Sequence, residues 1–234
     1  LHKYHGRVLL TLTGACGINC RYCFRRHFPY ENNNPRIANL NNITTYINND
    51  PSINEVILSG GDPLLMKDSQ LHKLFNTLSD IPHCKRIRIH TRMPIAIPQR
   101  INSTFIAALQ STRLQTIVVI HCNHPQEIDT HVAHSLQQMH QAGILVLNQS
   151  VLLHQVNDNA DTLIQLSEAL LQHNVLPYYL HRLDTVHGAA HFHVDNKTML
   201  QLQHQLQSRL PGYGVPKFVY EEAGATSKVM LNPY

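Results

Sequence analysis

Strand-like and helix-like segments alternate along most of the chain, and this alternation most strongly limits its fold. Six short runs rich in β-branched residues are predicted to be strands, and the last five begin about 30 residues apart. The predicted strands are 8–13, 55–59, 86–90, 115–121, 144–150 and 176–183, followed by a last one at 215–220. A strand followed by a helix at this spacing is typical of βαβ units, so we expect an α/β fold with a parallel sheet.

The segments between the predicted strands are expected to be helices that cover the sheet. In the segment 68–78, apolar residues recur at the spacing of one helix face; they are Leu71, Leu74, Phe75 and Leu78. Helices are likewise predicted at 127–141, 161–173 and 195–210. Two asparagine-rich stretches, 31–34 and 39–42, are predicted to be surface turns.

Polar residues gather where the predicted strands end. In chain order they are Cys16, Cys20 and Cys23, then Ser59, Gly60, Gly61 and Asp62, then His90 and Arg92, then His121, Gln149 and Asp184. A barrel brings the carboxyl ends of all its strands around one mouth, whereas an open sheet places them in a row with one useful switch point. The distribution therefore favours a six-stranded partial barrel, (β/α)6, over an open doubly wound sheet.

Composition limits the class of protein further. The chain has 234 residues, of which 43% are hydrophobic and 15% charged, with a net charge of +4, which suits one globular domain rather than a disordered chain. No apolar run approaches the roughly 18–20 residues of a membrane helix. No secretion signal is recognisable at the start. The chain begins at Leu1 rather than Met, so we expect that a segment precedes it.

The cysteines predict a metal or redox site rather than a disulfide scaffold. There are five, and Cys16, Cys20 and Cys23 lie within eight residues, a spacing that bridges poorly. A reducing, cytoplasmic compartment is the expected setting. The isolated Cys84 and Cys122 are predicted to be buried structural thiols.

Two kinds of metal centre are compatible with the three clustered thiols. His27 follows at a spacing that a Cys₃His zinc site allows. Alternatively, three thiolates can hold a four-iron cluster and leave one iron without a protein ligand, as a catalytic site requires. The position after the first strand of a βα series favours the iron–sulfur interpretation.

An arginine patch beside the cysteines leaves a second alternative open. Arg21, Arg25 and Arg26 alternate with aromatic residues, which would suit a nucleic-acid interface. Three arginines next to three cysteines are more economically an anion-binding part of a small site. Most of the 18 histidines are interpreted as surface residues, and His121 is singled out because it ends a strand; a structural role in the core is its alternative.

The cysteine motif resembles the signature of radical S-adenosylmethionine enzymes. Its pattern is Cys-x₃-Cys-x₂-Cys with the aromatic Tyr22 before the third cysteine. The segment Ser59-Gly-Gly-Asp62 resembles the glycine-rich segment that holds the methionine amine of that cofactor. Further stretches resemble the lysine 2,3-aminomutase family over essentially the whole chain; they are Leu1-His-Lys-Tyr-His-Gly-Arg7, Arg25-Arg-His-Phe-Pro-Tyr30, Asn148-Gln-Ser-Val-Leu-Leu153, Tyr178-Tyr-Leu-His-Arg-Leu-Asp184 and Gly188-Ala-Ala-His-Phe192.

The resemblance implies a domain organisation and an activity. It is closest to the branch of the family that supplies (R)-β-lysine for attachment to elongation factor P. Residues 1–234 would then be the radical core domain with a C-terminal lysine segment, without the further N-terminal segment of about a hundred residues that relatives carry. The implied cofactors are a 4Fe-4S cluster held by the three clustered cysteines, S-adenosylmethionine and pyridoxal phosphate. The implied partners are L-lysine and an external one-electron reductant, with no membrane or nucleic acid; a homo-oligomer is left open.

The resemblance also implies roles for individual residues. Lys228 would bind pyridoxal phosphate covalently, with Lys217 as a rival, and Lys3 and Arg7 would hold its phosphate. Arg25 would hold the substrate carboxylate, while Asp184 and Glu221 would hold its ε-ammonium. The residues implied near S-adenosylmethionine are Ser59, Gly60, Gly61, Asp62, His121 and Gln149. Two differences from relatives are notable: lysine rather than arginine at position 3, and glutamate rather than aspartate at position 221.

The resemblance leaves two alternatives to lysine 2,3-aminomutation for elongation factor P. One is an aminomutase of the same family that acts on free lysine or another amino acid. The other is the Cys₃His zinc module that binds nucleic acid.

Overall fold

One curved sheet runs through the whole molecule, and its strands follow one another in space as they do in the chain. The structure is a computed structural model that describes residues 2–26, 40–222 and 224–231. The strands are β1 (Arg7–Thr13), β2 (Glu55–Gly60), β3 (Arg86–Thr91), β4 (Gln115–Ile120), β5 (Leu145–Val151), β6 (Val175–His181), β7 (Lys217–Tyr220) and β8 (Val229–Met230). Strands β1 to β7 are parallel, and β8 pairs antiparallel with β7.

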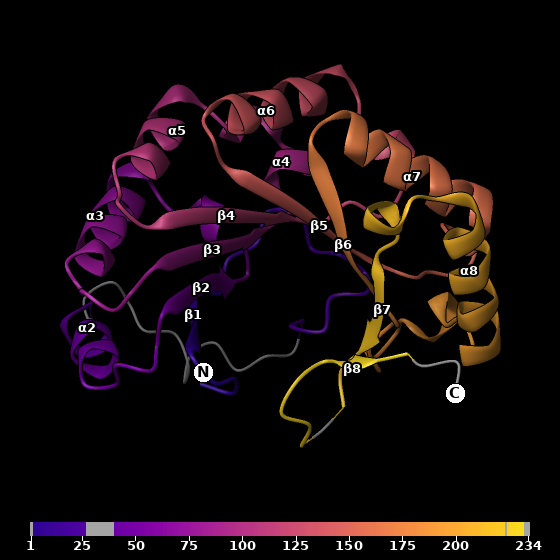
Figure 1. Cartoon of the computed structure of the whole chain (residues 1–234), viewed down its shortest axis with the longest axis horizontal. Coiled ribbons are helices and arrows are strands. Elements are labelled where there is room, and N and C mark those ends of the chain that lie inside the picture. The colour runs from indigo at the N-terminus through magenta and orange to yellow at the C-terminus, as the bar shows by residue number, and fades with distance from the viewer. Residues whose placement is uncertain (1, 27–39, 223, 232–234) are drawn as a thin grey trace.

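Helices cover the convex side of this sheet, so that the strands form the inner layer of a crescent (Figure 1). The helices are α2 (Leu40–Asn48), α3 (Asp68–Ser79), α4 (Met93–Ala96), α5 (Ser103–Gln110), α6 (Thr130–Gln141), α7 (Ala160–Gln172) and α8 (Asn196–Arg209). Among the described residues β1 and β8 do not pair, so the barrel stays open. The predicted partial barrel of α/β type is therefore confirmed, with β8 as an addition.

The apolar stripe predicted for the first amphipathic helix explains how the outer layer packs. All four of its members, Leu71, Leu74, Phe75 and Leu78, are at most 2% exposed. Each such side chain contributes roughly 1.5–3 kcal/mol when it is fully buried. On the sheet side they meet alternate strand residues, such as Val56 and Leu58 of β2.

The other strand residues point to the concave side, because successive side chains of a strand alternate between faces. In β3, Ile87 and Ile89 belong to the outer core, so Arg88 and His90 face inward. His90 is in register with Val119 of β4, so Val119 also faces inward. Two residues further along the chain, His121 faces the same side. The concave side therefore receives the polar residues that the sequence places near the strand ends.

Two differences from the predicted elements have physical reasons. Helix α2 begins at Leu40, so residues 40–42 are helical and the predicted surface turn is wrong there. The reason is that Leu40 and Ile47 are buried and anchor the helix to the core. Helix α5 is missed because it has only eight residues, and its signal is the cap in which Asn102 accepts from Phe105 N at 2.8 Å. The other asparagine-rich stretch, 31–34, lies outside the described residues.

The two isolated cysteines are buried, as predicted. Cys84 and Cys122 are both 0% exposed, and burial raises the pKa of Cys122 to about 12. Both therefore remain neutral thiols in the core. In the described part of the chain, none of the helices is both long and apolar enough to cross a membrane.

Candidate active site

The three clustered cysteines lie on the loop that follows β1 and are brought close together. All three are free thiols and partly buried. Within the loop, Cys23 N donates to Cys20 O at 3.1 Å and closes a turn. Burial raises the pKa of Cys23, and the neighbouring Cys20 and Cys16 raise it further. The loop thus holds three thiols near enough to influence one another.

The arrangement of these thiols bears on the two predicted metal centres. Among the described residues, no three His, Cys, Asp or Glu side chains converge on one point where a single ion would sit. A four-iron cluster attaches each thiolate to a different iron, so its ligands need not converge in that way. His27, the fourth ligand of the zinc interpretation, lies outside the described residues.

The glycine pair at the end of β2, Gly60 and Gly61, packs directly against the start of the cysteine loop. A Cβ atom on Gly61 would lie 2.0 Å from Ala15 O, and one on Gly60 would lie 2.4 Å from Thr13 O. The same segments are joined by backbone hydrogen bonds from Gly61 N to Thr13 O at 2.7 Å and from Asp62 N to Ala15 O at 2.9 Å. Glycine is required here because the two backbones approach too closely for any side chain.

The carboxylate of Asp62 fixes the same junction from the other side. It is 2% exposed and accepts hydrogen bonds from Leu64 N at 3.0 Å, Arg92 N at 2.8 Å and Thr91 Oγ1 at 2.7 Å. Burial raises its pKa, although these hydrogen bonds act in the opposite direction. Asp62 therefore ties the ends of β2 and β3 together beneath the cysteine loop.

Arg25 links the cysteine loop to the end of β2. Its Nη1 donates to Ser59 Oγ at 2.5 Å and to Gly60 O at 3.0 Å. The predicted carboxylate-binding arginine and two residues predicted near S-adenosylmethionine thus lie in contact. These residues come from two neighbouring strand ends, as the barrel arrangement requires.

Tyr22 of the cysteine motif is anchored by a hydrogen-bond network that the predicted site did not include. The Tyr22 hydroxyl accepts from Arg92 Nη1 and, at 2.5 Å, from Asn123 Nδ2. Arg92 Nη1 also donates to Cys20 Sγ at 3.2 Å, and its Nη2 donates to Glu127 Oε2 at 2.7 Å. Arg92 could be noticed as a polar residue after a strand, whereas Asn123 and Glu127 are brought in only by the tertiary fold.

Histidines line the inner wall of the sheet between the cysteine loop and the C-terminal segment. His121 Nε2 lies 2.9 Å from Gln149 Nε2, so these two predicted residues are brought together. Burial lowers the pKa of His121 to about 3, and the charges of Arg92, Arg25 and Lys228 add to this effect. His121 is therefore a neutral imidazole surrounded by cations.

The predicted lysine reaches this wall from the loop that precedes β8. Lys228 Nζ lies 5.7 Å from the ring centroid of Tyr179 and donates to Glu221 Oε1. Lys3 Nζ lies 3.3 Å from the other oxygen of Glu221, so this carboxylate bridges two lysines. Burial would raise the pKa of Glu221, but Lys228 and Lys3 outweigh it and lower the pKa.

The second predicted carboxylate is close to the first. Burial raises the pKa of Asp184, the charge of Glu221 raises it further, and Lys228 acts against both. The two carboxylates therefore form one acidic pair beside Lys228. The rival Lys217 is exposed at the first residue of β7, in register with Tyr179 of β6.

The two predicted phosphate-binding cations lie on one aromatic ring. Lys3 Nζ is 5.4 Å and the Arg7 guanidinium carbon 5.2 Å from the ring centroid of Tyr4. Through Glu221, Lys3 is linked in turn to Lys228. The predicted lysine and both predicted cations are thus connected by contacts.

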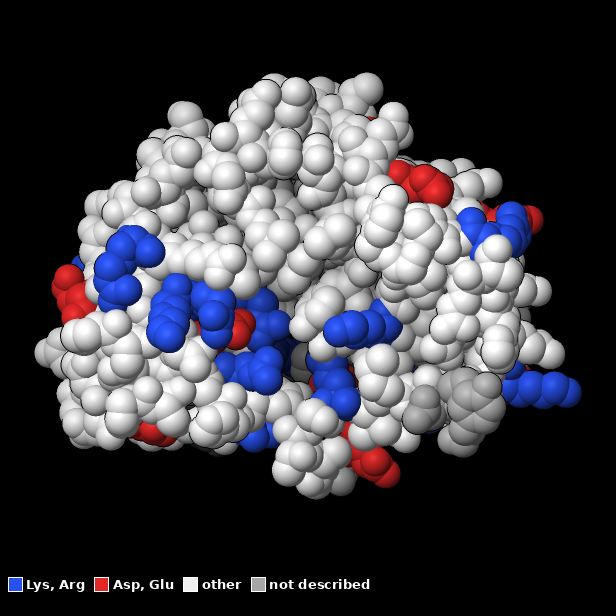
Figure 2. Space-filling model, viewed as in Figure 1, with Lys and Arg blue, Asp and Glu red and all other residues white. Residues whose placement is uncertain are grey.

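Basic side chains gather around the hollow of the molecule, with acidic ones among them, rather than forming a continuous stripe (Figure 2). Arg21, one of the three arginines of the nucleic-acid alternative, lies 3.1 Å from His191 Nε2 and packs over Phe192 at 5.1 Å. Arg21 and Arg25 are therefore both engaged in protein contacts, which favours the small-site interpretation of the patch.

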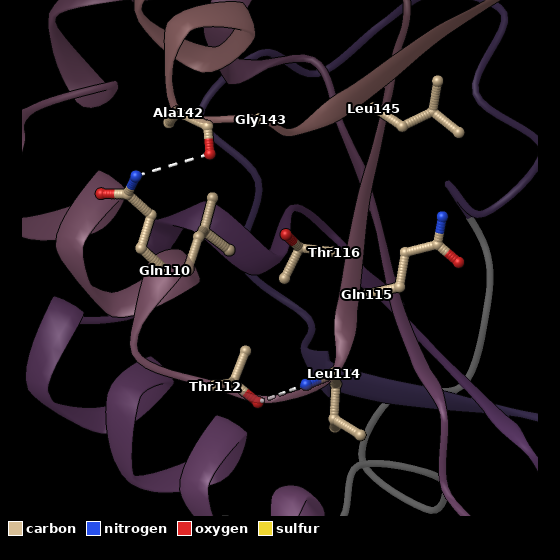
Figure 3. Close-up of a pocket in the computed structure, with 9 residues that line it drawn as sticks. Gln110, Thr112, Leu114, Gln115, Thr116, Ala142, Gly143 and Leu145 are labelled. Atoms are coloured by element: carbon tan, nitrogen blue, oxygen red, sulfur yellow. Dashed lines mark hydrogen bonds between the residues drawn. The ribbon is translucent and has the colours of Figure 1, made fainter.

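A separate pocket of about 360 Å³ lies at the other end of the strands, where β4 and β5 begin (Figure 3). Its polar groups are amides and hydroxyls, such as Gln110, whose Nε2 donates to Ala142 O at 3.4 Å. The pocket has no titratable side chain among its lining residues. These residues are Leu109, Gln110, Thr112, Leu114, Gln115, Thr116, Ala142, Gly143 and Leu145. We therefore place the chemistry at the cysteine loop.

Comparison with known proteins agrees with this placement. The chain matches the description of a 4Fe-4S single cluster domain over residues 5–94. It is 49% identical over 232 residues to the L-lysine 2,3-aminomutase of Buchnera aphidicola, covering 99% of this chain and 68% of the relative. It is also 49% identical over 230 residues to the L-lysine 2,3-aminomutase of Haemophilus influenzae, covering 98% and 68%. A crystal structure of a radical SAM methyltransferase from Sphaerobacter thermophilus matches with a TM-score of 0.62 and 14% identity, covering 93% of this chain and 67% of that one, which shows the fold alone.

Proposed function

Because this chain belongs to the family of the L-lysine 2,3-aminomutases, we propose that it is a radical S-adenosylmethionine isomerase that converts L-lysine into (R)-β-lysine. The observation that most supports this proposal is the meeting of distant segments around His121. The charges of Arg25, Arg92 and Lys228 all lower the pKa of that one histidine. This supports one shared site for the cysteine loop and the C-terminal lysine, as a reaction with two cofactors requires.

The cysteine loop suits a four-iron cluster with one open iron. Cys16, Cys20 and Cys23 supply three soft thiolate ligands on one short loop, and they influence one another electrostatically. With S-adenosylmethionine bound and an electron from an external reductant, such a cluster would supply radical chemistry. In this proposal Ser59, Gly60, His121 and Gln149 hold S-adenosylmethionine, and Asp62 and Gly61 fix the segment that presents it.

The C-terminal segment suits pyridoxal phosphate. Lys228 is partly buried above the Tyr179 ring, and two cations, Lys3 and Arg7, lie on Tyr4 nearby. An amine to bind the cofactor's aldehyde and cations to bind its phosphate are thus present together. When bound, pyridoxal phosphate supplies the imine chemistry that a 1,2-amino shift requires.

The charged side chains suit a lysine substrate. Arg25 is held by Ser59 and Gly60, which fixes its guanidinium as a partner for the substrate carboxylate. Asp184 and Glu221 repel each other, so a substrate ammonium that binds between them relieves that repulsion. The glutamate at position 221 also pairs with Lys3 and Lys228, which fixes the carboxylate before substrate enters.

We further propose that the product serves the modification of elongation factor P, in a reducing, cytoplasmic setting. The sequence stretches that resemble that branch support the first part, and three free clustered thiols support the second. The competing function is that of an aminomutase for free lysine or another amino acid.

Product analysis tests the proposal. The protein is reconstituted anaerobically with iron and sulfide, then incubated with L-lysine, S-adenosylmethionine, pyridoxal phosphate and dithionite. We expect β-lysine of R configuration by chiral chromatography. β-Lysine of S configuration would refute the elongation factor P branch, and turnover of another amino acid alone would refute lysine as the substrate. A colourless protein that holds one zinc would refute the radical mechanism.

A further inference from the structure

The side chain of Arg92 touches one of the three clustered cysteines. Its Nη1 lies 3.2 Å from Cys20 Sγ, within hydrogen-bond distance for a sulfur acceptor. The same nitrogen donates to the Tyr22 hydroxyl, and Nη2 donates to Glu127 Oε2 at 2.7 Å. Its side chain is 20% exposed, so solvent screens this contact only in part.

Arg92 is held in place from its backbone outward. It directly follows β3, and its backbone N donates to Asp62 Oδ2 at 2.8 Å. Glu127 is fixed in turn, because its other oxygen accepts from Asn123 N at 2.7 Å and His124 N at 3.0 Å. The guanidinium is therefore a positioned cation at the sulfur rather than a free surface charge.

A positioned cation at a cluster sulfur has an electrostatic consequence. One-electron reduction adds a negative charge to an iron–sulfur cluster, and hydrogen bonds to its sulfurs and nearby positive charge stabilise the reduced form. Arginine keeps its charge throughout the physiological pH range, so this effect does not depend on titration. Removing the charge would therefore make reduction harder.

We infer that Arg92 is a positioning and tuning residue that raises the reduction potential of the cluster through Cys20, and that Glu127 moderates it by partly neutralising the guanidinium. This inference rests on the proposed function, because it requires a cluster on the cysteine loop. It assigns the network around Tyr22 to electron uptake rather than to substrate binding. The step concerned is the transfer of one electron from an external reductant to the oxidised cluster.

The test measures the potential in variants that carry a full cluster. Arg92→Gln removes the charge, Arg92→Lys keeps it without the forked donors, and Glu127→Gln removes the moderating charge. The matched control Arg209→Gln also removes one arginine charge, but from a surface ion pair with Asp161. Each anaerobically reconstituted protein is analysed for iron and sulfide, then titrated with dithionite and redox mediators while the reduced-cluster signal is followed by electron paramagnetic resonance.

We expect Arg92→Gln to lower the equilibrium constant for reduction about tenfold, which corresponds to about 59 mV for one electron. Arg92→Lys should lower the reduction potential less. Glu127→Gln should raise the potential, and Arg209→Gln should leave it unchanged. If the substitutions acted only by loosening the loop, Arg92→Gln and Glu127→Gln would shift the potential in the same direction. The sign of the two shifts therefore distinguishes electrostatic tuning from a purely structural role.

Three results would overturn the inference. The first is a wild-type potential in both Arg92 variants at full iron content. The second is loss of the cluster from Arg92→Gln together with a wild-type potential in Arg92→Lys. The third is loss of the cluster from both Arg92 variants. The second and third results would each show that Arg92 only anchors the loop. If wild-type protein itself holds no iron, it is the proposed function that fails. If wild type produces β-lysine but the variants do not shift, only this inference fails.

Discussion

Replacing Gly61 by alanine should disturb the cysteine loop more than any other glycine substitution outside it. The Cβ would lie 2.0 Å from Ala15 O, 2.5 Å from the carbonyl carbon of the same residue and 2.8 Å from Gly14 O. All three are backbone atoms, so no side chain can move aside. The loop itself must retreat by more than 1 Å to restore ordinary contact at 3.4 Å.

The structure permits an estimate of the cost. Overpacking a filled site costs about 1–3 kcal/mol. The retreat also strains the hydrogen bonds from Gly61 N to Thr13 O and from Asp62 N to Ala15 O, each worth about 1 kcal/mol. We therefore expect the free energy of unfolding to fall by about 3 kcal/mol, which for a chain of this size lowers the melting temperature by roughly 6–12 °C.

Thermal unfolding by circular dichroism and iron analysis after reconstitution measure both consequences. The matched control is Gly212→Ala, whose Cβ would meet no atom within 4 Å and whose backbone has no left-handed conformation. Gly61→Ala should melt well below the control and hold less iron than wild type. Equal melting temperatures and a full cluster in both variants would refute the close-packing explanation of the glycine pair.

Three further predictions concern the C-terminal half of the site. Lys228→Ala should lose the visible absorbance of bound pyridoxal phosphate while Lys217→Ala keeps it; the reverse would identify Lys217 as the cofactor lysine. The pKa of Glu221 is lowered in the fold, so its ion pairs stabilise fully above the ordinary pKa of a glutamate and are lost as pH falls through the lowered value. Glu221→Gln should therefore flatten the acid limb of a plot of melting temperature against pH, and an unchanged limb would contradict this. His121 has a pKa of about 3 against an ordinary 6.5, so the unfolded chain binds a proton that the fold does not, and stability should decline as pH falls from 6.5. His121→Gln should reduce that decline, and a slope equal to that of wild type would show that His121 is not buried as a neutral imidazole.

The predictable part of the fold comes from periodicity. The strand and helix spacing determines a parallel α/β sheet, and the polar residues at strand ends distinguish a barrel from an open sheet. Strand β8 escapes prediction because it is two residues long and pairs only through contact with β7. Helix α2 escapes because its asparagines mark turns in most sequences, and burial of Leu40 and Ile47 overrides that preference.

The predictable part of the site consists of residues with local signatures. The cysteine spacing and the glycine pair are visible as short motifs, and Lys228 is proposed from the resemblance of its segment. The anchors of Tyr22 have no such signature, since Asn123 lies 101 residues away and Glu127 meets Arg92 across 35 residues. Among the described residues, the Nε2 atoms of His90 and His181 are buried without a hydrogen-bond partner. This could not be predicted from the sequence, because it depends on how the strands assemble into the sheet.

The central claim is that three thiols at the mouth of a partial barrel leave one iron of a four-iron cluster open for S-adenosylmethionine. The most direct test is the electron paramagnetic resonance spectrum of the reduced, reconstituted protein, recorded with and without that cofactor. We predict about four irons per chain and a spectrum that changes when S-adenosylmethionine is added. A spectrum that S-adenosylmethionine leaves unchanged, or a protein that takes up zinc and no iron, would contradict the claim.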